Sequence, residues 1–260
     1  MLTEICGEKL MNFSGISGRT FIGKALRFPL SLIPAGTQMP ILQGPLHGKR
    51  WIVGASNHGC WLGSYEYAKQ KAFSAAIKRG DVVYDLGANV GFYSLLASVL
   101  VGPEGQIFSF EPALRNLTFL RKHIELNGVK NCSVRDVAVS CSDGTAKFDL
   151  GPNSSMGHLT ADSPDALSVR TIALDSLVAS GQIPPPNVIK CDIEGGEYDA
   201  IRGASETLSK HSPMIFLATH GPEVHERCCR LLTDIRYVLT ALDDLPLNLT
   251  SEVLATRQQR

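Results

Sequence analysis

The apolar positions within residues 81–111 fall into alternating short and long runs. Residues 82–84 are β-forming and apolar or aromatic, a pattern typical of a strand that is buried on both faces of a parallel sheet. A glycine-containing turn follows, and residues 92–101 are apolar enough for a helix that packs on that sheet. Residues 106–110 again have a strand pattern. The stretch therefore predicts a strand, a turn, a helix and a second strand in succession.

The same alternation continues along the chain. Strong helix formers with a terminal glycine predict a helix within residues 63–80, and apolar residues at helical spacing predict another over 113–126. A further helix is expected from 197 to 209. Strands are predicted at residues 132–139, 146–150, 169–172, 188–192 and 214–218. Strands that alternate with helices indicate an α/β fold with a mostly parallel sheet and helices on both of its faces.

The N-terminal part of the chain differs from the rest. Residues 1–60 are rich in glycine and proline, with short apolar runs at 39–42 and 51–54, and we expect an arm and a cap there. Residues 61–260 are expected to form the main domain. With 260 residues and 44% apolar composition, the chain can bury one substantial core.

Charge and cysteine content narrow the class of protein. Acidic and basic residues balance at 25 each, so no global field attracts nucleic acid, and no nucleic-acid partner is expected. The seven cysteines include no Cys-x-x-Cys pair, which favours reduced thiols in a cytoplasmic protein. The sequence shows neither a signal-peptide pattern nor an apolar stretch long enough for a transmembrane segment.

The glycine turn after the first strand indicates a ligand. Gly87 and Gly91 bracket it, and glycine permits positive φ and close approach of a ligand to the backbone. A dinucleotide fingerprint needs glycine where this chain has Asp85 and Val90, and the Gly-Lys-Ser/Thr of a P-loop is absent. Asp85 would repel a pyrophosphate but suits a ligand with an ammonium and a sulfonium group. S-adenosylmethionine is such a ligand.

Polar residues at the ends of four predicted strands support a ligand site. Glu111 ends its strand about 20 residues beyond Gly91, the distance at which an acid can bind a ribose diol. Asp85, Asp192 and His220 also lie at or just past strand ends. Ligands of open α/β sheets bind beyond the carboxyl ends of the strands. We therefore expect these four side chains to converge.

Five motifs in order carry a resemblance to a known family. They are Leu62-Gly-Ser-Tyr-Glu66, Val83-Tyr-Asp-Leu-Gly-Ala-Asn-Val-Gly-Phe-Tyr93, Phe110-Glu-Pro112, Thr171-Ile-Ala-Leu-Asp175 and Ile189-Lys-Cys-Asp-Ile-Glu-Gly-Gly-Glu197. Over about residues 60–240 the chain resembles the FkbM-type S-adenosylmethionine-dependent methyltransferases, whose known members O-methylate hydroxyls of polyketides and sugars. The resemblance implies a Rossmann-like class I methyltransferase fold with S-adenosylmethionine as cofactor.

The resemblance also assigns roles to individual residues. Gly87, Asn89 and Gly91 would line the methionine part of the cofactor, Glu111 its ribose, and Asp192 the floor beneath the sulfonium. The expected cofactor site is completed by Glu66, Asp85, Pro112 and Asp136.

Two positions depart from the family pattern. Methyltransferases of this fold often have an adenine-binding acid at the end of the third strand, where this chain has Ala138, with Asp136 two residues earlier. After the last core strand the family often shows Glu-x-His, and this chain has Ala218-Thr219-His220. The histidine is present and the acid is missing.

Methyl transfer to a hydroxyl depends on alignment and benefits from a base whose pKa is near neutral. His220 is the first candidate for this base, because imidazole titrates in that range and its strand-end position faces the cofactor site. A hydrogen-bonding role behind the site is the alternative for His220. Asp192 is the second candidate, with a positioning role more than a proton-accepting one. His158, in the polar loop 151–168 that is either a lid or disordered, is the third, and His58 is comparable.

A group of acids raises the question of a metal. Asp192, Glu194 and Glu197 could suggest a divalent ion, as in some O-methyltransferases. Acids three apart at a helix start also favour the positive end of the helix dipole. We expect this second explanation and no metal.

The sequence therefore predicts an O-methyltransferase that acts on a hydroxyl of a small molecule or a carbohydrate. An RNA or protein methyltransferase is the second hypothesis, which the missing basic stripe and the absence of an Asn-Pro-Pro-Tyr-type motif disfavour. A non-catalytic module that binds S-adenosylmethionine is the third. Assembly into a homo-oligomer is left open.

Overall fold

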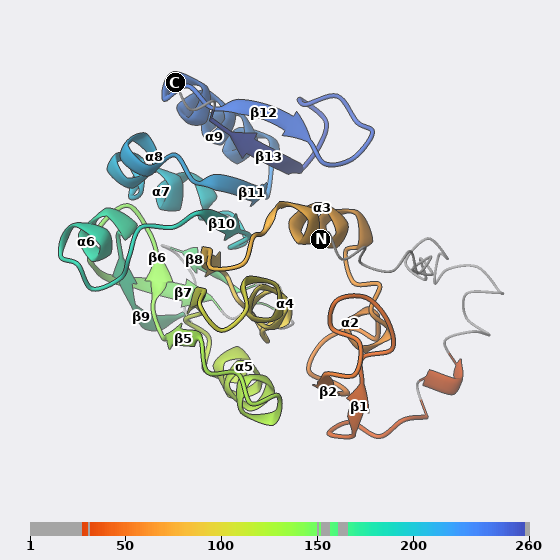
Figure 1. Ribbon diagram of the computed structural model, residues 1–260. Coiled ribbons are helices and arrows are strands. Elements are labelled where there is room, and N and C mark those ends of the chain that lie inside the picture. Colours follow the sequence, from red (N-terminus) through yellow and green to blue (C-terminus); the bar gives the residue numbers. More distant parts are fainter. Residues whose placement is uncertain (1–27, 31, 150, 152–156, 161–165, 258–260) are drawn as a thin grey trace.

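A seven-stranded sheet forms the centre of the molecule (Figure 1). The computed structural model describes residues 28–30, 32–149, 151, 157–160 and 166–257. The strands of the central sheet are β3 (Val82–Leu86), β4 (Gln106–Phe110), β5 (Cys132–Arg135), β10 (Val188–Cys191), β11 (Met214–Ala218), β12 (Val238–Ala241) and β13 (Glu252–Thr256). Their order is β12-β13-β11-β10-β3-β4-β5, with β13 antiparallel to both of its neighbours and the other pairs parallel.

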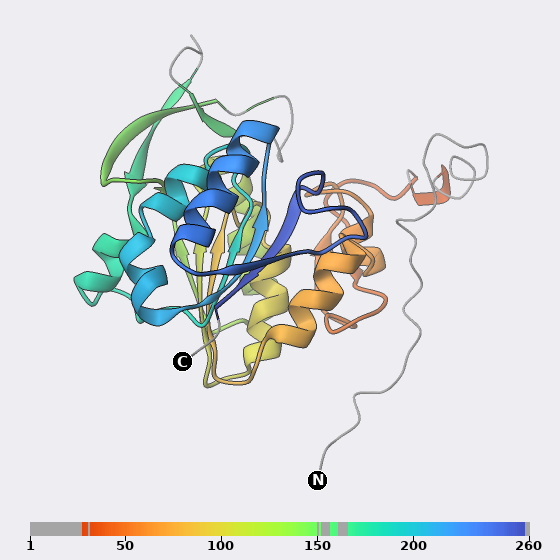
Figure 2. The same cartoon turned by 90° about the horizontal axis from the view of Figure 1, so that it is seen from above.

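Helices cover both faces of this sheet (Figure 2). On one face lie α3 (Tyr67–Ala76), α4 (Phe92–Val101) and α5 (Leu114–Leu126), and on the other lie α6 (Leu174–Ala179), α7 (Glu197–Arg202), α8 (Ser205–His211) and α9 (Pro222–Asp234). Each face has its own large apolar cluster. The predicted α/β fold with a mostly parallel sheet between two helical layers is confirmed.

The turn between β3 and α4 has the backbone that its glycines predict. Gly87 and Gly91 have φ of 73° and 96°, in the left-handed region. A Cβ on Gly87 would lie 2.0 Å from the carbonyl oxygen of Asp192, and one on Gly91 would lie 2.5 Å from the side chain of Leu120. The turn is therefore packed between the segment after β10 and helix α5, and a side chain at Gly87 would meet backbone atoms of Asp192.

The described part of the N-terminal segment forms a cap that packs into the same apolar cluster as α4. It contains the antiparallel hairpin β1 (Gln38–Pro40) and β2 (Arg50–Ile52) and the short helix α2 (Gly59–Leu62). Residues 1–27 of the expected arm lie outside the described residues.

A buried histidine attaches this cap to the main domain. The His123 ring on α5 stacks on Trp51 with centroids 3.9 Å apart. Its Nδ1 donates to the carbonyl of Val90 at 2.7 Å, and its Nε2 accepts from the Ile52 amide at 3.0 Å. Burial lowers the pKa of His123 to about 4. A neutral imidazole therefore links β2, α5 and the turn before α4.

A second, four-stranded sheet lies beside the central one. Its strands are β6 (Ala138–Val139), β7 (Gly144–Asp149), β8 (His158–Thr160) and β9 (Leu167–Ile172), in the order β6-β9-β7-β8. The predicted single strand over 132–139 was wrong, because β5 pairs with β4 in the central sheet and β6 pairs with β9 in the second. The predicted loop 151–168 was wrong at β8 and at the start of β9. Residues 152–156 and 161–165 of it lie outside the described residues.

Two predicted helices differ from the observed ones. The helix within 63–80 begins only at Tyr67, because Glu66 has a left-handed backbone with φ of 44°. The helix over 197–209 is divided into α7 and α8 at Gly203, which packs closely against the carbonyl of Ser140.

Among the described residues, none of the helices combines the length and apolar character that crossing a bilayer requires.

The cap attachment gives a prediction about stability. Replacing His123 by Phe keeps a ring beside Trp51 but leaves the Ile52 amide and the Val90 carbonyl without their buried partner. We expect the free energy of unfolding at pH 7 to fall by about 2 kcal/mol or more. Urea unfolding followed by circular dichroism measures it, with exposed His47→Phe as the control.

The same variant has a pH signature. The pKa of folded His123 lies below the ordinary value of 6.5, so its stabilising contribution is present above that value and is lost as the pH falls toward 4. The native chain should therefore lose more stability than His123→Phe between pH 7 and pH 4.5. Equal losses in the two proteins would contradict the buried, neutral state of this imidazole.

Candidate active site

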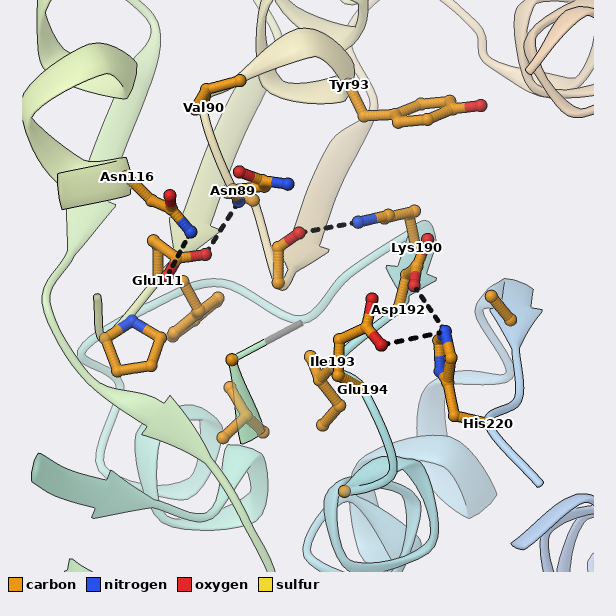
Figure 3. A pocket seen from close by; sticks show the side chains of 18 of the residues that line it. Asn89, Val90, Tyr93, Glu111, Asn116, Lys190, Asp192, Ile193, Glu194 and His220 are labelled. Atoms are coloured by element: carbon orange, nitrogen blue, oxygen red, sulfur yellow. Dashed lines mark hydrogen bonds and ion pairs between the residues drawn. The ribbon is translucent and has the colours of Figure 1, made fainter. Parts of the chain in front are cut away.

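A cavity of about 310 Å³ opens at the carboxyl ends of β3, β4, β10 and β11 (Figure 3). Seven residues that the sequence assigns to a site line it, namely Glu66, Gly87, Asn89, Glu111, Pro112, Asp192 and His220. They come from the N-cap of α3, the glycine turn and the ends of three parallel strands. The predicted convergence at one sheet edge is therefore observed for Glu111, Asp192 and His220.

Asp85 was expected in the same lining and is not part of it. It lies inside β3, is 1% exposed, and its Oδ1 is 3.3 Å from Nζ of Lys190. Its Oδ2 accepts from the Ser94 hydroxyl at 2.6 Å. The strand continues one residue beyond Asp85, so its carboxylate points into the domain instead of into the mouth of the turn. Its partner Lys190 donates to the carbonyl of Gly87 at 2.8 Å and so reaches the turn in its place.

Three other expected residues also lie outside the lining. Gly91 is the N-cap of α4 and packs on Leu120. Asp136 is 58% exposed and pairs with Arg170, with 3.1 Å between their nearest atoms. His158 is exposed on β8, although its neighbours Gly157 and Leu159 line the cavity.

One end of the cavity is apolar. Its walls there are Val137, Ala138, Val139 and Phe148, contributed by β6, β7 and the residue before β6. The sequence offered Asp136 as the substitute for a missing acid at this end. The structure instead has an apolar slot there, and such a surface suits a flat aromatic base.

Glu111 occupies the middle of the cavity wall and is held rigidly. Its Oε2 accepts from the Asn89 amide at 2.8 Å, and its Oε1 accepts from the Ala113 amide at 2.9 Å and from the Asn116 side chain at 3.3 Å. Burial raises the pKa of Glu111, and these hydrogen bonds oppose that rise. Because each carboxylate oxygen has two lone pairs, the group can still accept from a ligand hydroxyl.

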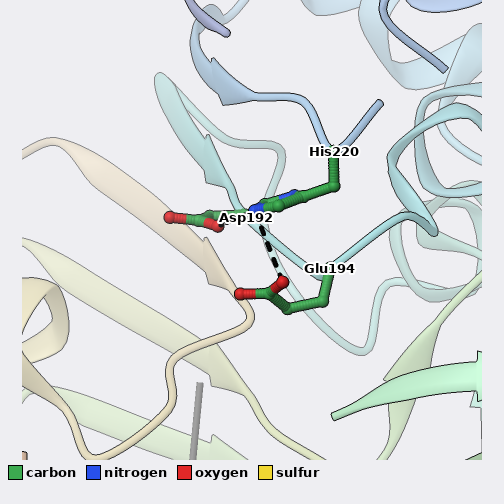
Figure 4. Close-up of side chains that lie close together, drawn as sticks. All are labelled: Asp192, Glu194 and His220. Atoms are coloured by element: carbon green, nitrogen blue, oxygen red, sulfur yellow. Dashed lines mark ion pairs between the residues drawn. The ribbon is translucent and has the colours of Figure 1, made fainter. Parts of the chain in front are cut away.

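The other end of the cavity carries a cluster of an imidazole and two carboxylates (Figure 4). Nε2 of His220 lies 3.7 Å from Oδ1 of Asp192 and 3.5 Å from Oε2 of Glu194. On its other side, Nδ1 of His220 is 2.8 Å from Oε1 of Glu197. The hydrogen bond with Glu197 and the charges of Glu197, Glu194 and Asp192 outweigh burial and raise the pKa of His220 to about 9.

Lys69 was not expected in the site and connects three of its carboxylates. The Lys69 side chain is 4% exposed, and its ammonium lies 3.0 Å from Glu66, 3.3 Å from Asp192 and 2.8 Å from Glu252. Burial alone would lower the pKa of Lys69, but the three carboxylates hold it above its ordinary value. In the sequence it is one of several lysines on a helix, and nothing marks it as buried.

The groups that line the cavity match the parts of a cofactor that carries an adenosine and a cationic amino acid. The apolar slot suits an adenine base, the Glu111 carboxylate suits a ribose diol, and the Glu66 and Asp192 carboxylates suit a cationic amino acid; all of them line the same cavity. Oε2 of Glu252 is buried with no hydrogen-bond partner in the described part of the chain. A ligand with a sulfonium and an ammonium complements these acids. The fold and this site define a class I S-adenosylmethionine-dependent methyltransferase.

The comparison with known families agrees. A family profile described as "Methyltransferase FkbM domain" matches residues 85–245. The chain belongs to the FkbM methyltransferase family, and S-adenosylmethionine is its cofactor. The resemblance drawn from the sequence motifs is thus confirmed.

Individual relatives cover only part of the chain. The chain is 29% identical to "Hexuronic acid methyltransferase AglP" from Haloferax volcanii over 128 residues. This alignment covers 49% of this chain and 52% of the relative. "Ribosomal RNA large subunit methyltransferase E" from Psychrobacter sp. is 32% identical over 103 residues, 38% of this chain and 48% of the relative. The chain thus matches about half the length of these curated relatives.

A solved structure supports the fold. The FkbM methyltransferase of Methylobacillus flagellatus KT superposes with a TM-score of 0.50 at 16% identity, covering 77% of this chain and 55% of that chain. At this identity the likeness concerns the fold alone.

The role of Glu111 gives a prediction about cofactor affinity. Replacing it by Gln keeps its size but removes the charge that strengthens hydrogen bonds to a ribose diol. We expect the Kd for S-adenosylmethionine to rise at least about tenfold, which corresponds to roughly 1.4 kcal/mol. Isothermal titration calorimetry measures it, with the exposed Glu104→Gln as the control. An unchanged Kd in Glu111→Gln would remove the ribose assignment.

Proposed function

We propose that the chain transfers the methyl group of S-adenosylmethionine to a hydroxyl oxygen of a sugar or a sugar-like small molecule, with His220 as the base. The observation that carries this proposal is the position of His220. Its Nδ1 is held by the buried Glu197, while its Nε2 lies at the cavity wall beside Asp192. An imidazole with one nitrogen fixed and the other at the cavity suits proton removal from a bound hydroxyl.

The chemistry requires little beyond alignment and one proton acceptor. The cofactor supplies an activated methyl group when bound. The chain's own part is to hold the acceptor oxygen in line and to remove its proton. The bond between the acceptor oxygen and the methyl carbon forms as the bond between that carbon and sulfur breaks, and the hydroxyl proton goes to Nε2 of His220. Asp192, paired with Lys69 at 3.3 Å, is assigned a positioning role.

His158 keeps a peripheral role in this proposal. It is exposed on β8, and its charge acts on Glu194 at the reactive end of the cavity. Because Gly157 and Leu159 on either side of it line the cavity, we place His158 at the rim and not in contact with the transferred proton.

A sugar acceptor is favoured over RNA by two observations. The hexuronic acid methyltransferase matches a larger part of this chain than the ribosomal RNA methyltransferase does, 49% against 38%. The chain also has no surplus of basic residues for a phosphate backbone, with 25 basic and 25 acidic side chains. The base and positioning groups around the cavity favour an enzyme over a module that only binds the cofactor.

Replacing His220 by Gln tests the proton acceptor. We expect the rate of methyl transfer to fall about a hundredfold or more, because the general base is lost, while the Kd for S-adenosylmethionine stays within about threefold. The rate is measured by transfer of labelled methyl to glucose and glucuronic acid glycosides. His211→Gln, a change on the distant helix α8, is the matched control.

The pH profile sharpens the same experiment. His220 accepts a proton only when it is neutral, and the pKa of its imidazole is raised to about 9. The native rate should therefore rise with pH across the neutral range and level off near or below pH 9, since a nearby sulfonium lowers that pKa. The variant should lack this rise. A native rate that is flat in pH, or a variant that keeps full activity, would contradict the role of His220.

The expectation that no metal takes part stays a prediction and has its own test. One atom each of Asp192, Glu194 and His220 lie within 4.8 Å of one another, so either a shared proton or a divalent cation would balance their charges. At neutral pH the raised pKa of His220 favours the proton, because a cation must displace it. We expect dialysis against EDTA to leave the transfer rate unchanged within about twofold. A loss that manganese or magnesium restores would overturn the prediction.

A further inference from the structure

Glu197 is a fully buried acid that contacts the imidazole proposed as the base. Its side chain is 0% exposed, and it does not line the cavity. Carboxylates are almost never fully buried unless they are paired. Its partners therefore show what it is buried for.

Two of these partners are backbone amides. Oε1 of Glu197 accepts from the Ile193 amide at 3.2 Å, and the Gly195 amide lies 3.0 Å and 3.1 Å from its two oxygens. Glu194 and Gly195 have positive φ of 56° and 100°, so the segment before α7 folds back over the carboxylate. These bonds fix the position of Glu197 at the start of α7.

The third partner is His220. Oε1 of Glu197 is 2.8 Å from Nδ1, across 23 positions of sequence. An ionised carboxylate can only accept hydrogen bonds, so Nδ1 carries a proton in both charge states of the ring. The proton that comes and goes is consequently the one on Nε2.

Within the described part of the chain, Nε2 of His220 forms no hydrogen bond. Its distances of 3.7 Å to Asp192 and 3.5 Å to Glu194 are too long for hydrogen bonds, although both acids contribute their charge. The view of Figure 3 shows His220 beside Asp192 and Glu194 at one end of the cavity. This is the nitrogen that a bound hydroxyl can approach.

Capping of α7 does not account for this arrangement. Capping explains the hydrogen bonds to the two backbone amides, which a neutral side chain of the same shape could also accept, although more weakly. It does not explain a third bond to an imidazole from a different strand end. The family's Glu-x-His spacing would put the acid at position 218, where this chain has Ala218. Glu197 brings an acid to His220 from α7 instead.

We propose that Glu197 is the positioning residue of the reaction, which holds His220 as the Nδ1-protonated tautomer and leaves Nε2 to accept the proton of the methyl acceptor. The assignment of a base rests on the proposed function, but the tautomer and its dependence on Glu197 do not. They belong to the chain without any acceptor.

The surroundings of His220 set the size of the expected effect. Asp192 and Glu194 come from the segment after β10, and Glu197 from α7; beyond Asp192, Lys69 of α3 pairs with Glu252 of β13. Removing the charge of Glu197 leaves two acids facing the ring. The pKa of His220, raised to about 9 in the native chain, should therefore fall by more than about one unit but stay near or above its ordinary value.

Nitrogen-15 NMR of the histidine rings in the full chain tests this directly, with His220→Gln used to assign the signals. We expect native His220 to show the Nδ1-protonated tautomer above its pKa, and Glu197→Gln, which preserves the hydrogen-bonding shape, to titrate at least about one pH unit lower. Asp199→Asn on the same helix, whose acid pairs with Arg202, should move the titration by no more than a few tenths. A glutamate that does not hold Nδ1 would leave the neutral His220 ring free to adopt the Nε2-protonated tautomer.

Two results would overturn the proposal. One is a native His220 that is protonated on Nε2 when neutral. The other is a folded Glu197→Gln in which the His220 titration is unmoved. Should Glu197→Gln fail to fold, the tautomer in the native chain still decides. Should no sugar accept a methyl group, the proposed function fails while this measurement stands.

Discussion

A buried ion pair between Asp85 and Lys190 holds the two central strands together at the level where the cavity begins. The two residues face each other in the register of β3 and β10, with their charged atoms 3.3 Å apart. Lys190 also donates to the carbonyl of Gly87, so the glycine turn is clamped from below. Because the Gly87 Cα approaches the Asp192 carbonyl closely, the turn and the segment after β10 cannot shift independently. Removing one partner of such a pair leaves an uncompensated charge in the core.

The contacts of Lys190 with Asp85 and Gly87 fix the two segments that carry the groups of the cavity. The turn presents the Asn89 amide to Glu111, and the segment after β10 carries Asp192 and leads through Glu194 to Glu197. Oppositely charged groups lie beside one another around the cavity. Lys69 pairs with Asp192, Glu66 and Glu252. His220 lies beside Asp192, Glu194 and Glu197. Such a balance lets the cavity hold a cationic cofactor beside a titratable base without an isolated buried charge.

The sequence predicted the elements whose pattern is local. The run from 82 to 84, the glycine turn and the apolar residues 92–101 are where the structure has β3, its turn and α4. The predictions were wrong where a contact between segments distant in sequence determines the local structure. Nothing in residues 132–139 reveals that the chain leaves the central sheet after Arg135, since both halves are suitable for strands. The φ of Glu66, which delays the start of α3, is likewise a consequence of packing.

For the site, the strand-end rule located Glu111, Asp192 and His220, because that rule depends only on where a parallel strand stops. The prediction for Asp85 was wrong because β3 extends one residue further, to Leu86. The Asp85 side chain therefore points into the core and not toward the ligand. Lys69 could not be identified from the sequence, since nothing in the sequence distinguishes a buried lysine from an exposed one. The Glu-Gly-Gly-Glu run did mark Glu197, and the missing acid at Ala218 was the signal that another acid had to be sought.

The central claim is that the cavity between the glycine turn and His220 is the methyl-donor site. A crystal structure of the chain with S-adenosylhomocysteine, the demethylated cofactor, tests it most directly. The adenine should lie in the slot beside Phe148, the ribose hydroxyls on Glu111, and the sulfur at the end of the cavity that carries Asp192 and His220. A ligand bound elsewhere, or one whose ribose does not touch Glu111, would contradict it.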